Sequence, residues 1–153
     1  MRLVLTIKLV FCILFGSAQD VRSTILENTR EIRSINQEDT AYDDLQFLKN
    51  EIGDKRIVML GEQDHGDAPT FEAKSRLVKF LHQEMGFEVL AFEADFFGVE
   101  RSWSEREEIG LDSAIRCIYP MWWGCKQNTV FDYVKAQVNS TNPLDIAGFD
   151  CRH

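Results

Sequence analysis

Proline and histidine are scarce in this sequence, with three of each among its 153 residues. Acidic residues outnumber basic ones by 25 to 17, which gives a formal net charge of −8. Since a nonspecific nucleic-acid surface needs clustered Lys and Arg, no nucleic-acid partner is expected. The nine glycines follow no repeat and 44% of the residues are apolar. Collagen-like, coiled-coil and disordered chains are thus excluded, and one globular domain is expected.

Several short enzyme and metal motifs are also missing. There is no GxSxG sequence, which disfavours a serine hydrolase, and neither GxGxxG nor GxxxxGK[ST], so nothing indicates a bound dinucleotide or nucleoside triphosphate. There is no CxxC pair and no HxxxH, and therefore a structural zinc site is not indicated.

A compact apolar run lies near the amino terminus. Arg2 and Lys8 precede the run and small residues follow it, an order that predicts a secretory signal peptide over residues 1–19, with cleavage near Ala18 or Gln19. The alternative, an uncleaved membrane anchor, needs about 18–20 uninterrupted apolar residues, more than the run provides. We expect a secreted or periplasmic protein with no stable membrane insertion after cleavage.

Three cysteines remain after cleavage: Cys117, Cys125 and Cys151. An odd number in an oxidising compartment permits at most one internal disulfide, for which Cys117 and Cys125 are the local candidates. Three small buried thiols are the alternative.

Helical and strand patterns alternate along the mature chain. A continuous apolar run at 56–60 predicts a strand covered on both faces, as in a parallel sheet. A helix from Asp67 to Met85 and a strand at 87–92 follow, and this order predicts a βαβ unit. The other expected elements are helices over 41–52, 99–108, 111–118 and 128–138, a short helix within 23–35, and a third strand over 144–149.

The fold class is therefore α/β: βαβ units with a mostly parallel sheet flanked by helices. The sequence stops three residues after Asp150. A parallel sheet that stopped there would leave an edge and an apolar face uncovered, so we expect an incomplete domain.

Acidic residues follow each of the three expected strands: Glu62, Glu93 with Asp95, and Asp150. Sites in open α/β sheets lie outside the carboxyl ends of the strands, so these residues should gather at one edge together with His65. A histidine oriented by carboxylates can act as a general base toward water. The same group can bind a divalent metal. The alternative for each acid is to cap a helix or accept loop N–H bonds.

The sequence around His65 belongs to a longer pattern. Residues 60–66 read Leu-Gly-Glu-Gln-Asp-His-Gly, which resembles the GExxHG signature of the erythromycin esterase family. The similarity continues through 71–77, the Phe-Glu-Ala-Asp sequence at 92–95, residues 120–123 and the Gly-Phe-Asp sequence at 148–150, in the family's order and spacing. It covers about Ile57 to Asp150, so residues 20–153 resemble the N-terminal portion of that hydrolase domain.

The resemblance implies hydrolysis of a macrolide lactone, a response to antibiotic, without a covalent serine intermediate. By analogy His65 would activate water, and Glu62 and Glu93 would orient or assist it. The partner would be a small-molecule ester or lactone. No cofactor is expected, while a divalent metal stays open. The substrate-binding residues would be Lys74, Arg76, Asp95, Trp122, Trp123 and Asp150.

Several of these residues have plainer alternatives. Lys74 and Arg76 can be solvated helix cations, and Arg76 can pair with Glu72 one turn away. Trp122 and Trp123 can pack their loop onto the core instead of forming an apolar platform for substrate. His82, at the border of the apolar face of its helix, is expected to be structural.

The chain departs from the family in two ways. Thr129 stands where members often have an acidic residue, and the C-terminal half that contributes further histidines is missing. We therefore expect the 153-residue chain alone to be inactive. A secreted metal- or ligand-binding module that uses the same residues, or an inactive fragment, are the alternatives.

Overall fold

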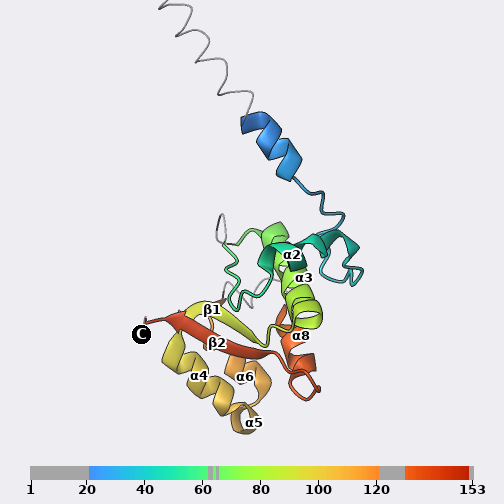
Figure 1. The fold of residues 1–153 in the computed structure, drawn as a ribbon. Coiled ribbons are helices and arrows are strands. Elements are labelled where there is room, and N and C mark those ends of the chain that lie inside the picture. The colour runs from blue at the N-terminus through green and yellow to red at the C-terminus, as the bar shows by residue number, and fades with distance from the viewer. Residues whose placement is uncertain (1–20, 62–63, 65, 121–129, 152–153) are drawn as a thin grey trace, which may run out of the picture. The chain divides into compact units, whose positions relative to one another are not determined.

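The computed structural model describes residues 21–61, 64, 66–120 and 130–151 of the chain (Figure 1). The chain falls into two parts, Met1–Ile32 and Arg33–His153, and each is considered by itself. In the first part residues 21–28 are helical, and the predicted signal peptide lies outside the described residues. No described helix is long and apolar enough to cross a membrane.

The second part begins with two short helical elements in place of the predicted helix over 41–52. These are the 3-10 helix η1 (Asp43–Leu45) and the helix α2 (Phe47–Ile52). Tyr42 and Leu45 are buried in one apolar cluster. In a 3-10 turn residues three apart lie above each other, so this conformation directs both side chains into the cluster. As predicted, the helical stretch stops at Gly53, whose φ is 57°.

The strand predicted at 56–60 does not form. Residues 57–60 belong to no helix or strand, so the prediction is wrong. Their side chains nevertheless alternate: Val58 and Leu60 pack against apolar clusters, whereas Ile57 is 79% and Met59 90% exposed. A run that is apolar on both sides fits a strand only where a neighbouring strand and a second layer are present.

The helix α3 (Ala68–Met85) follows the sequence prediction closely. Asp67 is its N-cap residue, proline lies in its first turn, and Gly86 ends it in the left-handed conformation with φ 72°. Glycine adopts this conformation without the steric cost that a Cβ would bring. Strand β1 (Val89–Asp95) starts two residues later than predicted and extends through Asp95.

Within the described residues, four helices lie between β1 and the second strand, β2 (Asp145–Asp150). The strands are parallel, as predicted, with Val89 opposite Asp145 and Phe92 opposite Gly148. A parallel pair requires such a crossover, because its ends lie at opposite edges of the sheet. The four helices are α4 (Phe96–Ser104), α5 (Arg106–Ile109), α6 (Leu111–Ile115) and α8 (Val130–Gln137).

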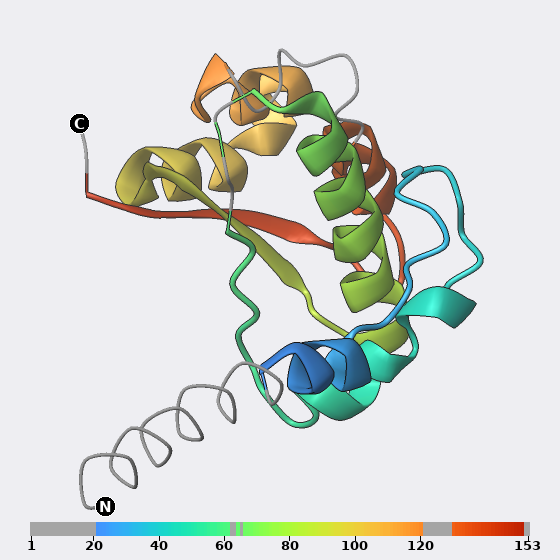
Figure 2. The same cartoon turned by 90° about the horizontal axis from the view of Figure 1, so that it is seen from above.

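The main apolar cluster lies between the helices and one face of this sheet. Phe92 and Ile146 point into it from the strands, and Phe92 stacks on Phe131 of α8 with ring centroids 5.2 Å apart. Figure 2 shows α3, α4, α6 and α8 on the same side of the two strands. On the opposite face Val89 is 57% and Phe149 66% exposed. The described residues thus form an α/β domain with helices on one face of a parallel sheet.

Candidate functional site

Two of the predicted acidic residues meet at the carboxyl ends of the strands. Asp95 ends β1 and Asp150 ends β2, and they are partners in the register of the sheet. The ladder is irregular between Phe92 and Asp95, so the pairing resumes only at these two residues. Both side chains are half-buried. The backbone positions of these two acidic residues therefore lie side by side at one edge of the sheet.

Gly148 makes the close approach of the two strand ends possible. A Cβ at this position would lie 2.6 Å from the carbonyl oxygen of Ala94 and 2.8 Å from that of Asp95. It would also lie 2.9 Å from the Cα of Phe96. Since Cβ atoms essentially never come this close to backbone, only glycine fits where β1 passes into α4.

Asp95 also caps the helix that follows it. Its Oδ2 accepts a hydrogen bond of 2.6 Å from the backbone N–H of Gly98, in the first turn of α4. A Cβ on Gly98 would lie 2.6 Å from the same oxygen, so Gly98 leaves room for the cap. One oxygen of Asp95 thus has the capping role that the sequence left as an alternative.

Glu93 and Asp150 differ in their surroundings. Glu93 is exposed and, by strand alternation, lies on the face opposite to that of Phe92 and Ala94. The Oδ1 of Asp150 accepts a hydrogen bond of 2.8 Å from the N–H of Cys151. Glu93 is therefore open to solvent, whereas Asp150 also holds the turn that follows β2.

Four predicted site residues lie outside the described residues: Glu62, His65, Trp122 and Trp123. The described neighbours of the first two, Gly61 and Gly66, lie between the extended segment at 57–60 and the start of α3. Gly66 has a φ of 85°, a conformation that favours glycine. Thr70 donates a hydrogen bond to the carboxylate of Asp67 at the helix start.

The two predicted substrate-binding cations on α3 face different surroundings. Two residues along a helix correspond to a rotation of about 200° around its axis, so Lys74 and Arg76 lie on nearly opposite faces of α3. Lys74 is half-buried, with its Nζ 6.0 Å from the ring centroid of Phe71. This geometry allows a weak cation–π contact.

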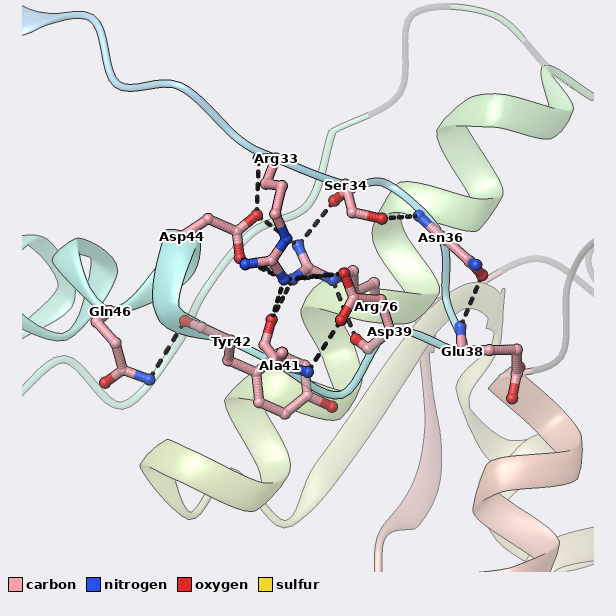
Figure 3. A network of polar contacts seen from close by, with 10 residues as sticks. All are labelled: Arg33, Ser34, Asn36, Glu38, Asp39, Ala41, Tyr42, Asp44, Gln46 and Arg76. Atoms are coloured by element: carbon pink, nitrogen blue, oxygen red, sulfur yellow. Dashed lines mark hydrogen bonds and ion pairs between the residues drawn. The ribbon is translucent and has the colours of Figure 1, made fainter.

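Arg76 is only 1% exposed and lies at the centre of a polar network (Figure 3). Its Nη1 and Nη2 donate to the two carboxylate oxygens of Asp44, at 3.0 and 2.7 Å. Its remaining N–H groups donate to the carbonyl oxygens of Ser34, Asp39 and Ala41. All five donors of a guanidinium are thereby used. Arg76 thereby ties residues 34–44 to α3, and its side chain has a structural role among the described residues.

The partner of Arg76 shows the electrostatic effect of this pairing. The hydrogen bonds from Arg76 lower the pKa of Asp44 from 3.8 to about 2. In the same network Arg33 donates to Asp39 at 2.9 Å, which lowers the pKa of the Asp39 carboxyl. Glu72, the local partner considered from the sequence, is replaced by a residue 32 positions earlier in the chain.

His82 is structural, as expected. It is 2% exposed, and its Nδ1 lies 2.6 Å from the hydroxyl oxygen of Tyr133 on α8. Its Nε2 is buried and has no hydrogen-bond partner among the residues that the structure describes. The sequence shows no sign of the partnership with Tyr133, because 51 residues separate the two side chains.

The described cysteines and acids form neither a disulfide nor a metal cluster. Cys117 and Cys151 carry free thiols, and burial raises the pKa of the Cys117 thiol. Cys125 lies outside the described residues. Over the part of the chain that the structure describes, no group of three or more His, Cys, Asp or Glu side chains is placed to hold a metal ion.

Comparison with known proteins adds a reaction class to this geometry. No family model matches the chain. This chain is 35% identical over 122 residues to a Bacillus subtilis (strain 168) protein that carries the name “Putative hydrolase YbfO”. It is 39% identical over 62 residues to erythromycin esterase type II of Escherichia coli. These similarities support a hydrolase-like family for the chain. The resemblance to erythromycin esterases found in the sequence is more specific than that.

Two solved structures share the fold. One is a Bacillus cereus protein and the other is named a succinoglycan biosynthesis protein. Each has a TM-score of 0.69 and 22% sequence identity, and they cover 85% and 88% of this chain. At this identity the likeness shows the fold alone.

The chain is short beside all of these proteins. The alignments take in 79% and 40% of this chain but 27% of YbfO and 15% of the esterase. The structural alignments take in 32% and 34% of the two solved proteins' own chains. The matched region is thus about a third or less of each relative.

Proposed function

We propose that the protein is an exported ester or lactone hydrolase whose active site forms at the carboxyl ends of β1 and β2. The observation that carries this proposal is the pairing of Asp95 with Asp150, which brings two carboxylates to one edge of a parallel sheet. The hydrolase names of the two relatives support the reaction class. The esterase among them makes a macrolide lactone the first substrate to test, and a response to antibiotic the expected role.

His65 is the proposed general base, and Glu62 and Glu93 are the carboxylates that orient its ring. The imidazole takes a proton from water while the water oxygen attacks the carbonyl carbon of the ester. The bond from this carbon to the alcohol oxygen then breaks, and the imidazolium returns the proton to that oxygen. The products are a carboxylic acid and an alcohol, which stay on one molecule when the substrate is a lactone.

The remaining residues are proposed to bind the substrate. Lys74 polarises the carbonyl oxygen through its positive charge, and Trp122 and Trp123 provide an apolar surface for a bulky ring. Asp95 and Asp150 form the polar side of the site. Arg76 is not included, because its five donors are already used.

This route needs no cofactor, since the nucleophile is water and the base is a side chain. The expected rate is therefore the same with and without a metal chelator. A rate that falls with chelator and returns with a divalent cation would instead favour metal-assisted hydrolysis.

Since the 153-residue chain alone is expected to be inactive, the test is turnover by the complete protein as its own cells produce it, and by the His65→Ala variant of that protein. Incubation with a macrolide lactone and with a series of aryl esters is followed by mass spectrometry, which detects lactone opening as the addition of one water. We expect turnover of at least one substrate and its loss in the variant, with an unchanged circular dichroism spectrum. Equal rates for the two proteins, or no turnover of any ester or lactone, would overturn the proposal.

A further inference from the structure

The helix α4 runs back along β2, so its start lies at the carboxyl ends of the strands (Figure 1, Figure 2). Two contacts fix this direction. Near the far end of α4 the indole Nε1 of Trp103 donates to Asp145, the first residue of β2, at 2.9 Å. At the near end the Cα of Phe96 lies against Gly148, where a Cβ would come within 2.9 Å of it. The first residue of α4 is therefore held at the edge where the two paired aspartates lie.

The side chain of Phe96 extends past this edge. Phe96, Val99 and Trp103 have the spacing of one helical face, and Val99 and Trp103 are buried in the main apolar cluster. Phe96 shares their face of α4 but is 59% exposed. Side chains on a helix point toward its N-terminus, which here is the direction of the strand ends. The ring of Phe96 therefore lies beyond the sheet, at the carboxyl ends of the strands.

The turn that carries Phe96 is held on two sides. The carboxylate of Asp95, the residue before it, accepts the N–H of Gly98 at 2.6 Å and so closes the first turn of α4 around Phe96. The backbone of Phe96 packs against Gly148 on the other side. A phenylalanine on such a fixed turn loses little conformational freedom when a ligand packs on its ring. Phe96 thus has the position of a preorganised binding group.

Phe96 adds an apolar surface to an edge that otherwise carries carboxylates. It directly follows Asp95, and its backbone lies beside β2 two residues before Asp150. Small-molecule sites combine apolar and aromatic walls with a few polar groups. A single exposed phenylalanine is ordinary on a protein surface. Phe96 differs from that ordinary case because its neighbours in the chain and in the sheet are carboxylates of the proposed active site.

The next residue, Phe97, shows what an exposed phenylalanine looks like outside this arrangement. It is 64% exposed, about as much as Phe96. It lies about 100° further around α4, on the side of the exposed Arg101 one turn later. The two residues are equal in type and similar in exposure, and they differ in the face of the helix that they occupy.

We propose that Phe96 is a substrate-binding residue that makes the site prefer esters and lactones with a large apolar group beside the bond that is hydrolysed. The proposal rests on the function proposed above, since it names the substrate class of the same site. The apolar group packs on the ring of Phe96 and is removed from water, which favours binding. A small acyl group such as acetyl does not cover the ring and gains nothing from it.

The test uses the complete protein as its own cells produce it, and the Phe96→Ser and Phe97→Ser variants of that protein. The substrates are two esters of 4-nitrophenol, the acetate and the 4-phenylbutyrate, which share a leaving group and differ in the apolar acyl group. We expect the ratio of kcat/KM for the phenylbutyrate to that for the acetate to fall about tenfold in Phe96→Ser, mainly through KM. The ratio should stay unchanged in Phe97→Ser, the matched control.

A binding measurement keeps this test separate from hydrolysis. The probe is the N-methylamide of 4-phenylbutyric acid, which has the same apolar group and a far less reactive carbonyl. Titration calorimetry should give a Kd about tenfold weaker for Phe96→Ser than for the unaltered protein, and an unchanged Kd for Phe97→Ser. The Phe96→Leu variant keeps an apolar side chain and should retain most of the affinity.

The outcomes separate this proposal from the proposed function. Amide binding that depends on Phe96, without turnover of any ester, would overturn the function and support the binding role. Turnover with the same substrate ratio in all three proteins would overturn the binding role alone, and so would equal losses in Phe96→Ser and Phe97→Ser. A Tm that falls strongly in both Phe96→Ser and Phe96→Leu would mean that the ring packs inside the complete protein, which also overturns it. Neither turnover nor amide binding would overturn both proposals.

Discussion

The guanidinium of Arg76 forms a two-point ion pair with the carboxylate of Asp44, with nitrogen–oxygen distances of 2.7 and 3.0 Å. The side chains are 2% and 7% exposed, so the pair is shielded from water. It joins η1 to the middle of α3, two elements that otherwise meet through the apolar cluster of Tyr42, Leu45, Phe80 and Leu81.

Replacement of Asp44 by Asn should strongly destabilise the protein. The variant removes the negative charge of the nearer carboxylate and leaves the buried guanidinium with only the carboxylate of Asp39, at 3.7 Å, a change that costs about 3 kcal/mol in comparable pairs. Asp43→Asn is the matched control, because this neighbour is exposed. Urea unfolding at neutral pH should show the free energy of unfolding lowered by about 3 kcal/mol in Asp44→Asn and by less than about 0.5 kcal/mol in the control. Equal effects would mean that the ion pair does not stabilise the fold.

The same pair predicts a pH dependence. Because the pKa of Asp44 falls from 3.8 to about 2 on folding, the folded state binds the proton more weakly than the unfolded state. The stabilisation is therefore complete above about pH 4 and is lost as the pH falls toward about 2. The difference in unfolding free energy between the wild type and Asp44→Asn should shrink over this interval. A difference that stays constant down to the acid limit would contradict the assigned pKa.

Gly148→Ala should disrupt the strand ends. The new Cβ would meet three backbone atoms, two of them carbonyl oxygens, none of which can rotate away as a side chain could. Overpacking of this kind costs about 2–3 kcal/mol. The matched control is Gly61→Ala, since a Cβ there meets no atom of the described residues within 4 Å beyond its chain neighbours. Thermal unfolding followed by circular dichroism should show a lower Tm for Gly148→Ala alone, and equal Tm values would contradict the close approach.

Tyr133→Phe should loosen the contact between α3 and α8. The tyrosine hydroxyl is the partner of His82 Nδ1, and its removal leaves both ring nitrogens of His82 without a partner among the described residues. A buried polar group without a partner costs about 1–2 kcal/mol. Tyr119→Phe is the control, because Tyr119 is exposed. Urea unfolding gives the free energy of unfolding of both variants, and we expect a loss for Tyr133→Phe only. An equally large loss in the control would argue against the hydrogen bond.

Local signals in the sequence predicted the elements that have local causes. The helix α3 begins with a proline in its first turn, directly after Asp67, and stops before the left-handed Gly86, and both signals act within one turn. The parallel strands followed from the order of strand and helix patterns. The pairing of Asp95 with Asp150 followed from the rule that parallel strands end at one edge.

Features with distant causes were missed. Arg76 has Glu72 one turn away, but its partner Asp44 lies 32 residues earlier, and no local pattern distinguishes the two. Residues 57–60 have the apolar pattern of a covered strand, yet strand pairing depends on neighbours elsewhere in the fold. Both failures concern tertiary contacts, which periodicity and spacing do not encode.

The role of Glu93 can be separated from that of negative charge in general. Glu93→Gln keeps the size of the side chain but removes the carboxylate proposed to orient His65, so kcat should fall about a hundredfold or more. Glu88→Gln is the matched control, because Glu88 is also exposed and lies just before the opposite end of β1. The measurement is the rate of ester or lactone hydrolysis by the native protein and the two variants, at saturating substrate.

The comparison also separates catalysis from folding. Both positions are exposed, so neither variant should change the Tm by more than a degree or two, and a loss of rate then belongs to the chemistry. A lower kcat for Glu93→Gln with a normal rate for Glu88→Gln would support the site at the carboxyl ends of the strands. Equal rates for the two variants would remove Glu93 from the mechanism and leave His65 to be oriented by Glu62 alone.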